Sequence, residues 1–169
     1  MKISTWNVNS VNARIEHLEK FIKKDQSDIY LLQELKTIED GFPKEVIKNA
    51  GYYSYVNGQK AWNGVAILSK EKLEITNTSI PTYDDPNARF IETEIQLKKI
   101  KKNIKLINIY LPNGNPIETE KFDYKIKWMK KFNSYIQGLK NKNIPIIISG
   151  DFNVIPTDDD VYSPENFKN

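Results

Sequence analysis

Several apolar segments of this sequence end in side chains of the kind that bind metal ions or phosphate. The segments have the length of buried β-strands, and ligand sites in layered α/β folds gather at the carboxyl ends of strands. Neighbouring strands would therefore bring these polar groups to one edge of the molecule. The groups are Asn7, Glu34, Tyr110, Asn113, Asp151 and Asn153.

The chemistry of these side chains suits a hard divalent cation. Glu34 and Asp151 supply carboxylates, and Asn7 and Asn153 supply neutral amide oxygens. Mg²⁺ takes oxygen ligands and is usually held by one or two carboxylates together with substrate phosphate. The sequence has no cysteine and a single histidine, His17, which excludes a thiolate site and a multi-histidine zinc site. We therefore expect Mg²⁺ as the cofactor, with Mn²⁺ as a substitute.

Each of these residues also has a purely structural interpretation. Glu34 fits a solvated strand end, and Asp151 and Asn153 after a glycine fit an Asx-turn. Tyr110 fits a core aromatic residue whose hydroxyl finds a partner, and Asn7 fits a helix cap. No single position decides between the two interpretations, and only the set as a whole favours a site.

Hydrophobic periodicity predicts the elements that must position these groups. Strands are expected at residues 2–8, 28–33, 52–56, 65–68, 73–78, 90–97, 104–111 and 145–149. Helices are expected at 11–24, 43–49 and 122–139, a basic turn at 98–103, and no regular structure at 150–169. The long helix should bury one face, formed by Phe122, Ile126, Met129, Phe132, Ile136 and Leu139. Residues 1–169 are thus expected to form a single α/β domain.

Composition places the chain among ordinary globular proteins, with 39% hydrophobic and 28% charged residues. The longest apolar runs have strand length, and the N-terminus lacks the apolar region of a secretory signal, so we expect a cytoplasmic protein without membrane spans. The net charge of +3 is explained more often by a lysine-coated surface than by a nucleic-acid partner. Only Arg14 and Arg89 are arginines, the better bidentate phosphate ligand.

Five motifs, in order along the chain, resemble the N-terminal motifs of the endonuclease/exonuclease/phosphatase superfamily. They are most similar to the exonuclease III branch of bacterial apurinic/apyrimidinic endonucleases. The motifs are Ser4-Thr-Trp-Asn7-Val-Asn, Leu31-Leu-Gln-Glu34, Gly58-Gln-Lys60 with Gly64-Val-Ala-Ile-Leu-Ser69, Asn108-Ile-Tyr110-Leu-Pro-Asn-Gly114 and Ser149-Gly-Asp151-Phe-Asn153. The resemblance implies the N-terminal part of a four-layer α/β/β/α sandwich of the DNase I-like type.

The resemblance also implies a role for each motif residue. Glu34 would be the principal metal ligand with Asn7 beside it, and Tyr110 would contact the scissile phosphate. Asp151 would activate the attacking water, and Asn153 would orient the phosphate. Both Asp151 and Asn153 also count as candidate metal ligands.

Substrate contacts are expected from Arg89, Asn113 and Lys60. Arg89 lies where the family places a DNA-contacting arginine, and a strand-end salt bridge is the alternative for it. The implied substrate is double-stranded DNA with abasic sites or 3′ ends, cut by a monomeric enzyme.

Some features depart from the family pattern. Leu35 stands where the family has threonine, and Ala88 stands where a glycine is usual before the arginine. The family's C-terminal half, with a further aspartate and a Ser-Asp-His motif, has no counterpart among the 169 residues. We therefore expect activity far below that of a full-length relative, and exposed apolar surface where the sandwich is incomplete.

Three functions compete at this level. The first is an abasic-site endonuclease with 3′→5′ exonuclease activity. The second is a superfamily phosphoesterase acting on another substrate, such as a lipid headgroup or an inositol phosphate. The third is an inactive remnant that only binds DNA through its lysines.

Overall fold

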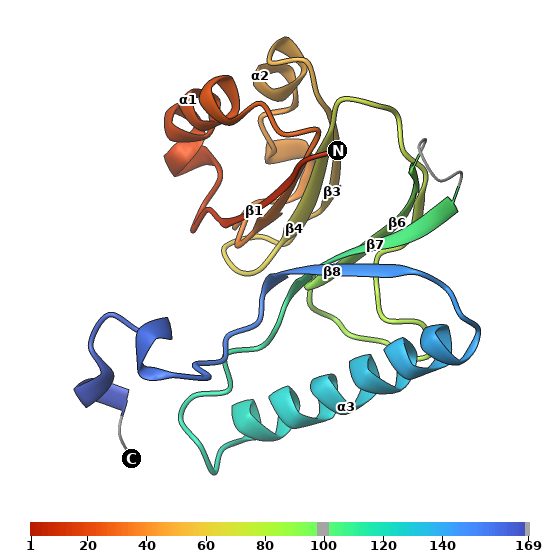
Figure 1. Ribbon diagram of the computed structural model, residues 1–169. Helices are drawn as coiled ribbons and strands as arrows, with labels where there is room; N and C mark the ends of the chain where they lie inside the picture. Colours follow the sequence, from red (N-terminus) through yellow and green to blue (C-terminus); the bar gives the residue numbers. More distant parts are fainter. Residues whose placement is uncertain (98–101, 168–169) are drawn as a thin grey trace.

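Eight β-strands form two sheets that pack face to face among residues 1–97 and 102–167, the part of the chain that the computed structural model describes (Figure 1). Helices lie on the outer face of each sheet. The result is a four-layer α/β/β/α arrangement, and it confirms the fold class that the family resemblance implies.

The first sheet has the strand order β1-β2-β4-β3. Its strands are β1 (Ile3–Asn7), β2 (Ile29–Gln33), β3 (Tyr53–Asn57) and β4 (Val65–Ser69). Strands β1 and β2 run parallel, and Asn7 pairs with Gln33 in their register. Every residue of β2 and β4 is buried, as continuous apolar runs covered on both faces predict.

The second sheet has the strand order β5-β6-β7-β8. Its strands are β5 (Ile75–Asn77), β6 (Phe90–Leu97), β7 (Lys102–Tyr110) and β8 (Ile146–Asp151). Strands β7 and β8 are parallel, and Tyr110 pairs with Asp151. In both sheets, therefore, a parallel strand pair ends in residues that the sequence assigns to the site.

Two helices cover the first sheet and one long helix covers the second (Figure 1). The α-helices are α1 (Ile15–Asp25), α2 (Lys44–Asn49) and α3 (Glu120–Asn141). Short 3-10 helices are η1 (Asn12–Arg14), η2 (Glu39–Gly41), η3 (Asp158–Asp160) and η4 (Pro164–Phe167). None of the helices in the described ranges is long and apolar enough to cross a membrane.

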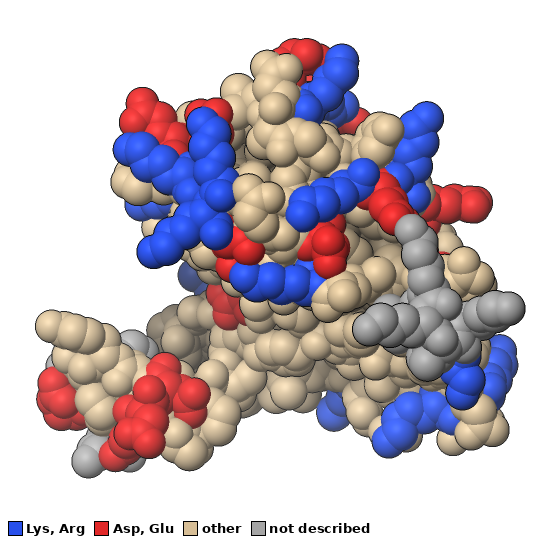
Figure 2. Space-filling view, turned by 45° about the horizontal axis from the view of Figure 1, so that its top comes forward, with Lys and Arg blue, Asp and Glu red and all other residues tan. Residues whose placement is uncertain are grey.

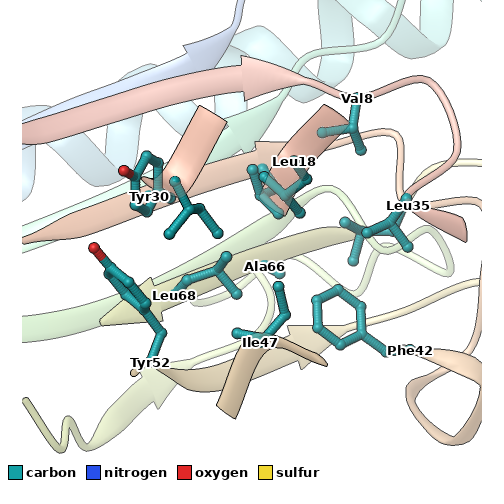
Figure 3. Packing of buried hydrophobic residues seen from close by; sticks show 12 residues of the cluster. Val8, Leu18, Tyr30, Leu35, Phe42, Ile47, Tyr52, Ala66 and Leu68 are labelled. Carbon is teal, nitrogen blue, oxygen red and sulfur yellow. The ribbon is translucent and has the colours of Figure 1, made fainter. Parts of the chain in front are cut away.

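Three apolar clusters hold the layers together. Figure 3 shows the first, in which Leu18 of α1, Ile47 of α2 and Leu68 of β4 pack on the outer face of the first sheet. The second lies between the sheets, where Leu31 and Ile67 belong to the same cluster as residues of β6 and β7. The third joins α3 to the second sheet.

The buried face of α3 differs from the predicted one. Trp128, Phe132 and Leu139 are buried, whereas Met129 is 37% exposed. Trp128 stacks on Phe132 with ring centroids 5.2 Å apart. The prediction that Met129 belongs to the buried face was therefore wrong. The large aromatic ring of Trp128, the preceding residue, packs against the sheet instead.

Other departures from the predicted elements are small. Strand β5 is shorter than the expected 73–78, and residues after 150 include the end of β8, η3 and η4. The expected turn at 98–103 falls largely on residues 98–101, outside the described part of the chain. His17 is exposed on α1, as expected for a surface residue.

A polar pair lies within the apolar interface between the sheets. Gln33 of β2 and Asn108 of β7 are both buried, and Nε2 of Gln33 donates to Oδ1 of Asn108 at 2.7 Å. Asn108 Nδ2 donates in turn to the carbonyl oxygens of Leu32 and Ala66, at 3.0 and 2.9 Å. These bonds compensate for the burial of two amides and fix how the sheets sit on one another.

Candidate active site

The carboxyl ends of β1, β2, β7 and β8 meet at one end of the sandwich. Asn7 is the last residue of β1, and Glu34 follows the last residue of β2. Tyr110 and Asp151 are paired at the ends of β7 and β8. The topology thus brings together four residues that lie up to 144 positions apart in the sequence.

Asn7 connects the two carboxylates of the site. Its Nδ2 donates to Oε1 of Glu34 at 2.8 Å and to Oδ2 of Asp151 at 2.7 Å. Its Oδ1 accepts the backbone N–H of Asn9 at 3.0 Å, which orients the amide. Because one NH₂ group reaches both carboxylates, Glu34 and Asp151 face a common point.

Glu34 accepts hydrogen bonds from three directions. Besides Asn7, the Tyr110 hydroxyl donates to Oε1 at 2.9 Å, and the Lys36 ammonium lies 3.1 Å from Oε2. Burial works to raise the pKa of Glu34, but the bonds from Asn7, Lys36 and Tyr110 outweigh it and hold the pKa below its ordinary value. Glu34 is therefore an anion at neutral pH.

The backbone at Glu34 adopts a left-handed conformation, with φ of 53°. A non-glycine residue there costs on the order of 1–3 kcal/mol, and such strain is concentrated at functional sites. The strained segment is held in place because Leu35 and Lys36 donate their backbone N–H groups to the carbonyls of Gly64 and Asn63. This loop geometry aims the Glu34 carboxylate at Asn7 rather than into solvent.

Asp151 and Asn153 form the predicted Asx-turn and also belong to the site. Oδ1 of Asp151 accepts the backbone N–H of Asn153 at 2.9 Å, while Oδ2 faces Asn7. The Asn153 Nδ2 donates to the carbonyl of Leu111 at 2.7 Å. Gly150 permits this path, because its φ is 139° and a Cβ there would lie 2.0 Å from the carbonyl oxygen of Ile109. Asp151 and Asn153 can therefore form an Asx-turn and still take part in a functional site.

Tyr110 is a neutral hydrogen-bond donor. Burial and the adjacent Glu34 carboxylate raise the pKa of its hydroxyl to about 12. The phenol therefore stays protonated at neutral pH and cannot act as a base.

Arg89 lies against the ring of Tyr110. Its guanidinium carbon is 4.8 Å from the Tyr110 ring centroid and 5.8 Å from that of Tyr124. One Nη donates to the carbonyl of Tyr110 at 3.1 Å, and Nε is buried without a partner. Arg89 forms no ion pair with any carboxylate in the described part of the chain, so the strand-end salt bridge considered for it is wrong.

Two clefts flank the loop that carries Asn113 and Asn115. One of about 510 Å³ is lined by Asn7, Asp151 and Asn153, and the other of about 560 Å³ is lined by Glu34, Tyr110 and Arg89. Asn113 lines both clefts, whereas Lys60 lines neither and is exposed. The structure therefore unites all of the predicted site residues except Lys60.

Sequence reasoning missed several polar residues around these clefts. Lys36, next to a strained turn, pairs with Glu34, and its Nζ donates to Oδ1 of Asn9 at 2.6 Å. Gln59, Asn63 and Asn87 form a linked amide network in the wall of the second cleft. The signals in the sequence were the position of Lys36 two residues after Glu34 and the place of Gln59 in the Gly58-Gln-Lys60 motif. The amide network depends on loop packing, which no local pattern reveals.

The donor set fits a hard cation with few protein ligands. Within the described ranges, no group of three or more histidine, cysteine, aspartate or glutamate residues could hold a metal ion. The site instead offers two carboxylates and the neighbouring amides of Asn7 and Asn153. This set matches the preference of Mg²⁺ for one or two carboxylates, with water and phosphate completing the coordination.

The visible surface does not carry one continuous basic patch. Figure 2 shows lysine and arginine interspersed with acidic residues on the main body, and acidic side chains gathered on the C-terminal segment. That segment includes Asp158, Asp159, Asp160 and Glu165, which are all exposed. The net charge alone therefore does not identify a partner.

Known proteins that are similar to this chain in sequence are named as exodeoxyribonucleases. The chain is 36% identical to exodeoxyribonuclease III of Haemophilus influenzae over 95% of its own length and 60% of the relative's length. It is 30% identical to an exodeoxyribonuclease of Bacillus subtilis, covering all of this chain and 65% of the relative.

Solved structures give the same result. The structure of an AP endonuclease from Archaeoglobus fulgidus superimposes with a TM-score of 0.88 at 33% identity, over 100% of this chain and 63% of that protein. A 3′-5′ exonuclease from Neisseria meningitidis superimposes with a TM-score of 0.87 at 34% identity, over 99% and 64%. The chain thus spans less than two thirds of the length of these relatives.

Residues 4–169 match the family described as the endonuclease/exonuclease/phosphatase family, and its relatives share both the sequence and the fold of this chain. The chain belongs to the endonuclease/exonuclease/phosphatase family.

Proposed function

We propose that this chain supplies the first part of the active site of a Mg²⁺-dependent DNA phosphodiesterase of base-excision repair. The observation that carries the proposal is the single Asn7 amide that donates to both Glu34 and Asp151. The Tyr110 hydroxyl donates to the same Glu34 oxygen. The carboxylates of Glu34 and Asp151 suit a cation, and the neutral Tyr110 hydroxyl suits an oxygen of the phosphate that the cation would bind.

Glu34 would be the principal ligand of Mg²⁺, with Asn7, Asp151 and Asn153 beside it. When bound, Mg²⁺ would neutralise charge on the phosphate oxygens and stabilise the departing oxygen. Mn²⁺ is expected to substitute for it. Lys36, which pairs with Glu34, would balance the carboxylate charge in the absence of the cation.

Three side chains would bind the phosphate and activate the attacking water. Tyr110, a phenol with a raised pKa, would donate a hydrogen bond to a non-bridging phosphate oxygen. Asn153 would orient the same phosphate through its amide. Asp151 would accept a proton from the attacking water, a role that typically contributes ~10²–10⁴-fold to the rate.

The proposed substrate is double-stranded DNA with an abasic site or a 3′ end. Relatives in this family are named exodeoxyribonuclease and DNA-(apurinic or apyrimidinic site) endonuclease. Arg89 and Asn113, in the walls of the clefts, and Lys60, on the surface, would contact the DNA backbone. Cleavage 5′ to the abasic site with additional 3′→5′ exonuclease activity is the reaction we assign. The monomeric state and the cytoplasmic location stay predictions from the sequence.

A cleavage assay tests the proposal. Duplex DNA with one tetrahydrofuran abasic analogue is incubated with the 169-residue chain in Mg²⁺ or in EDTA. We expect slow incision 5′ to the analogue that requires Mg²⁺ and is lost in Glu34→Gln. The exposed Lys130→Met variant of α3 serves as the matched control and should cut like the wild type.

Three results would contradict the proposal. Incision that survives in EDTA or in Glu34→Gln would remove the metal site from the reaction. Binding of the duplex with equal affinity by wild type and Glu34→Gln, without any cleavage, would favour a protein that only binds DNA. Hydrolysis of an inositol phosphate in preference to the duplex would assign the site to another phosphoester.

A further inference from the structure

Lys125 of α3 joins two loops of the candidate active site. Its Nζ donates to the carbonyl oxygen of Asn113 at 3.0 Å and to that of Asn153 at 2.8 Å. Asn113 follows β7 and Asn153 follows β8, and the two loops also meet directly where Asn153 Nδ2 donates to the carbonyl of Leu111. A single ammonium on the outer helix therefore connects the two loops from behind.

The stem of Lys125 is packed as closely as its head group. A Cβ added to Gly114 would lie 2.5 Å from Cδ and 3.0 Å from Cβ of Lys125. Gly114 also has a φ of 79°, which a residue with a side chain adopts only with strain. The loop after β7 thus has a glycine at the point where the lysine stem passes beneath it.

Lys125 differs from the other lysines of its helix. Lys125 is half-buried, whereas the other lysines are exposed, namely Lys121, Lys127, Lys130, Lys131 and Lys140. Burial lowers the pKa of Lys125, and no carboxylate in the described part of the chain forms an ion pair with it. Burying a cation is unfavourable unless hydrogen bonds to the protein replace its hydrogen bonds to water. For Lys125, the backbone carbonyls of the two site loops provide these hydrogen bonds.

The two carbonyls belong to residues at the first cleft. Asn113 and Asn153 both line it, and Asn153 also donates its backbone N–H to Asp151. Fixing the carbonyl of Asn153 restricts the peptide unit that follows the Asx-turn. Fixing the carbonyl of Asn113 does the same for the loop on the opposite wall.

We propose that Lys125 is a positioning residue, which sets the separation of the Asn113 and Asn153 loops and so places their side-chain amides at the phosphate site. The inference rests on the proposed function for its consequence in catalysis. Its structural part, the clamp between two loops, does not depend on which phosphoester is cut. Lys125 itself lines neither cleft, so it acts through the two asparagines.

Three variants test the clamp. Lys125→Met keeps an unbranched stem against Gly114 and removes the charge and the donors. Lys125→Arg keeps both, and Lys130→Met makes the same change at an exposed position of the same helix. Lys125→Gln, which keeps a donor without the charge, replaces Lys125→Met if the methionine variant does not fold.

The first measurement is the NMR spectrum of the metal-free chain. We expect Lys125→Met to shift the side-chain amide signals of Asn113 and Asn153 and to speed hydrogen exchange of the Asn153 backbone N–H. Lys125→Arg should restore both, and Lys130→Met should change neither. This measurement needs no activity, so it decides the clamp even if the cleavage assay fails.

The second measurement separates kcat from KM on the abasic duplex. A misplacement of about 1 Å in a reacting group costs ~10²-fold in rate, so Lys125→Met should lower kcat by roughly that factor with a smaller change in KM. Lys125→Arg should recover most of kcat.

Unchanged asparagine signals together with an unchanged kcat in folded Lys125→Met would overturn the inference. A kcat that falls only in proportion to the unfolded fraction would also overturn it, because Lys125 would then be a stabilising residue alone.

Discussion

Gln33 and Asn108 meet between the two sheets, with Nε2 of Gln33 donating to Oδ1 of Asn108 at 2.7 Å. Gln33 immediately precedes Glu34, and Asn108 lies two residues before Tyr110. The pair therefore fixes the strand end that carries the principal candidate ligand against the strand end that carries the phenol. The buried hydrogen bond between Gln33 and Asn108 thus helps to fix the position of Glu34 relative to Tyr110.

Asn108→Ala should destabilise the fold. The change removes the shortest of the three hydrogen bonds that the Gln33 amide donates, and also the donors to two buried carbonyls, so the free energy of unfolding should fall by about 1–3 kcal/mol. Denaturant titration measures the change. Asn103→Ala, at an exposed position of the same strand, should stay within about 0.5 kcal/mol of wild type. Equal losses in the two variants would show that the buried pair has no special role.

Tyr110→Phe should reduce catalysis without disrupting the fold. The variant keeps the ring that stacks on Arg89 and loses the hydroxyl that faces Glu34. Removing one donor at a developing charge costs ~10²–10³-fold in kcat, and the expected loss is at the lower end because the metal shares the charge. Tyr53→Phe, at an exposed tyrosine of β3, is the control. A kcat that is unchanged in Tyr110→Phe would remove the phenol from the mechanism.

Much of the site could be predicted because its residues follow strands. Periodicity places the ends of β1, β2, β7 and β8 within a few residues, and parallel pairing then brings Asn7, Glu34, Tyr110 and Asp151 to one edge. The four-layer order is what the resemblance to the superfamily implies, and periodicity adds only that each apolar run or helix face must be covered.

The remainder depended on tertiary contacts that leave no local pattern. Nothing in the local sequence distinguishes Lys125 from the exposed lysines of α3. It differs from them only because two loops that are distant in the sequence bring their carbonyls to its ammonium. A helical pattern defines the buried face of a helix only to within about one residue, so it predicts a buried Met129. In the structure the neighbouring Trp128 is buried instead, and Met129 is exposed. Lys60 was assigned from its motif alone, and its neighbours in the loop face the cleft instead.

Glu92 should make stability depend on pH. Its side chain is fully buried and accepts bonds from Lys105 at 2.8 Å, from Thr76 at 2.6 Å and from the Tyr135 hydroxyl. Burial acts to raise the pKa of Glu92, but these bonds hold it below the ordinary value. A carboxylate with a depressed folded-state pKa contributes stability above its unfolded pKa of about 4.3, and this contribution is lost as the pH falls.

The measurement is the free energy of unfolding between pH 7 and pH 3. We expect the wild type to lose more stability over this range than Glu92→Gln does. Glu94→Gln, at the 47% exposed neighbour that lies 3.5 Å from Lys105, should retain the wild-type slope. Parallel curves for wild type and Glu92→Gln would show that Glu92 does not set the acid sensitivity.

Arg89→Met should weaken DNA binding and make it less dependent on salt. Each phosphate contact contributes about 0.9 to the slope of log K against log salt concentration for duplex DNA, so the loss of one contact should reduce the slope by roughly that amount. Fluorescence anisotropy at several salt concentrations measures it, with Lys130→Met as the control. An affinity that falls without a change in slope would mean that Arg89 acts by holding Tyr110 and not by touching phosphate.

Paramagnetic Mn²⁺ tests most directly whether Asn7, Glu34, Asp151 and Asn153 form a cation site. Added at low concentration to the isotope-labelled chain, Mn²⁺ should first broaden the side-chain amide signals of Asn7 and Asn153. Excess Mg²⁺ should reverse the broadening, and Glu34→Gln should abolish it. Broadening that starts instead at the acidic segment around Asp158–Asp160, with Asn7 unaffected and Glu34→Gln identical to wild type, would contradict the account.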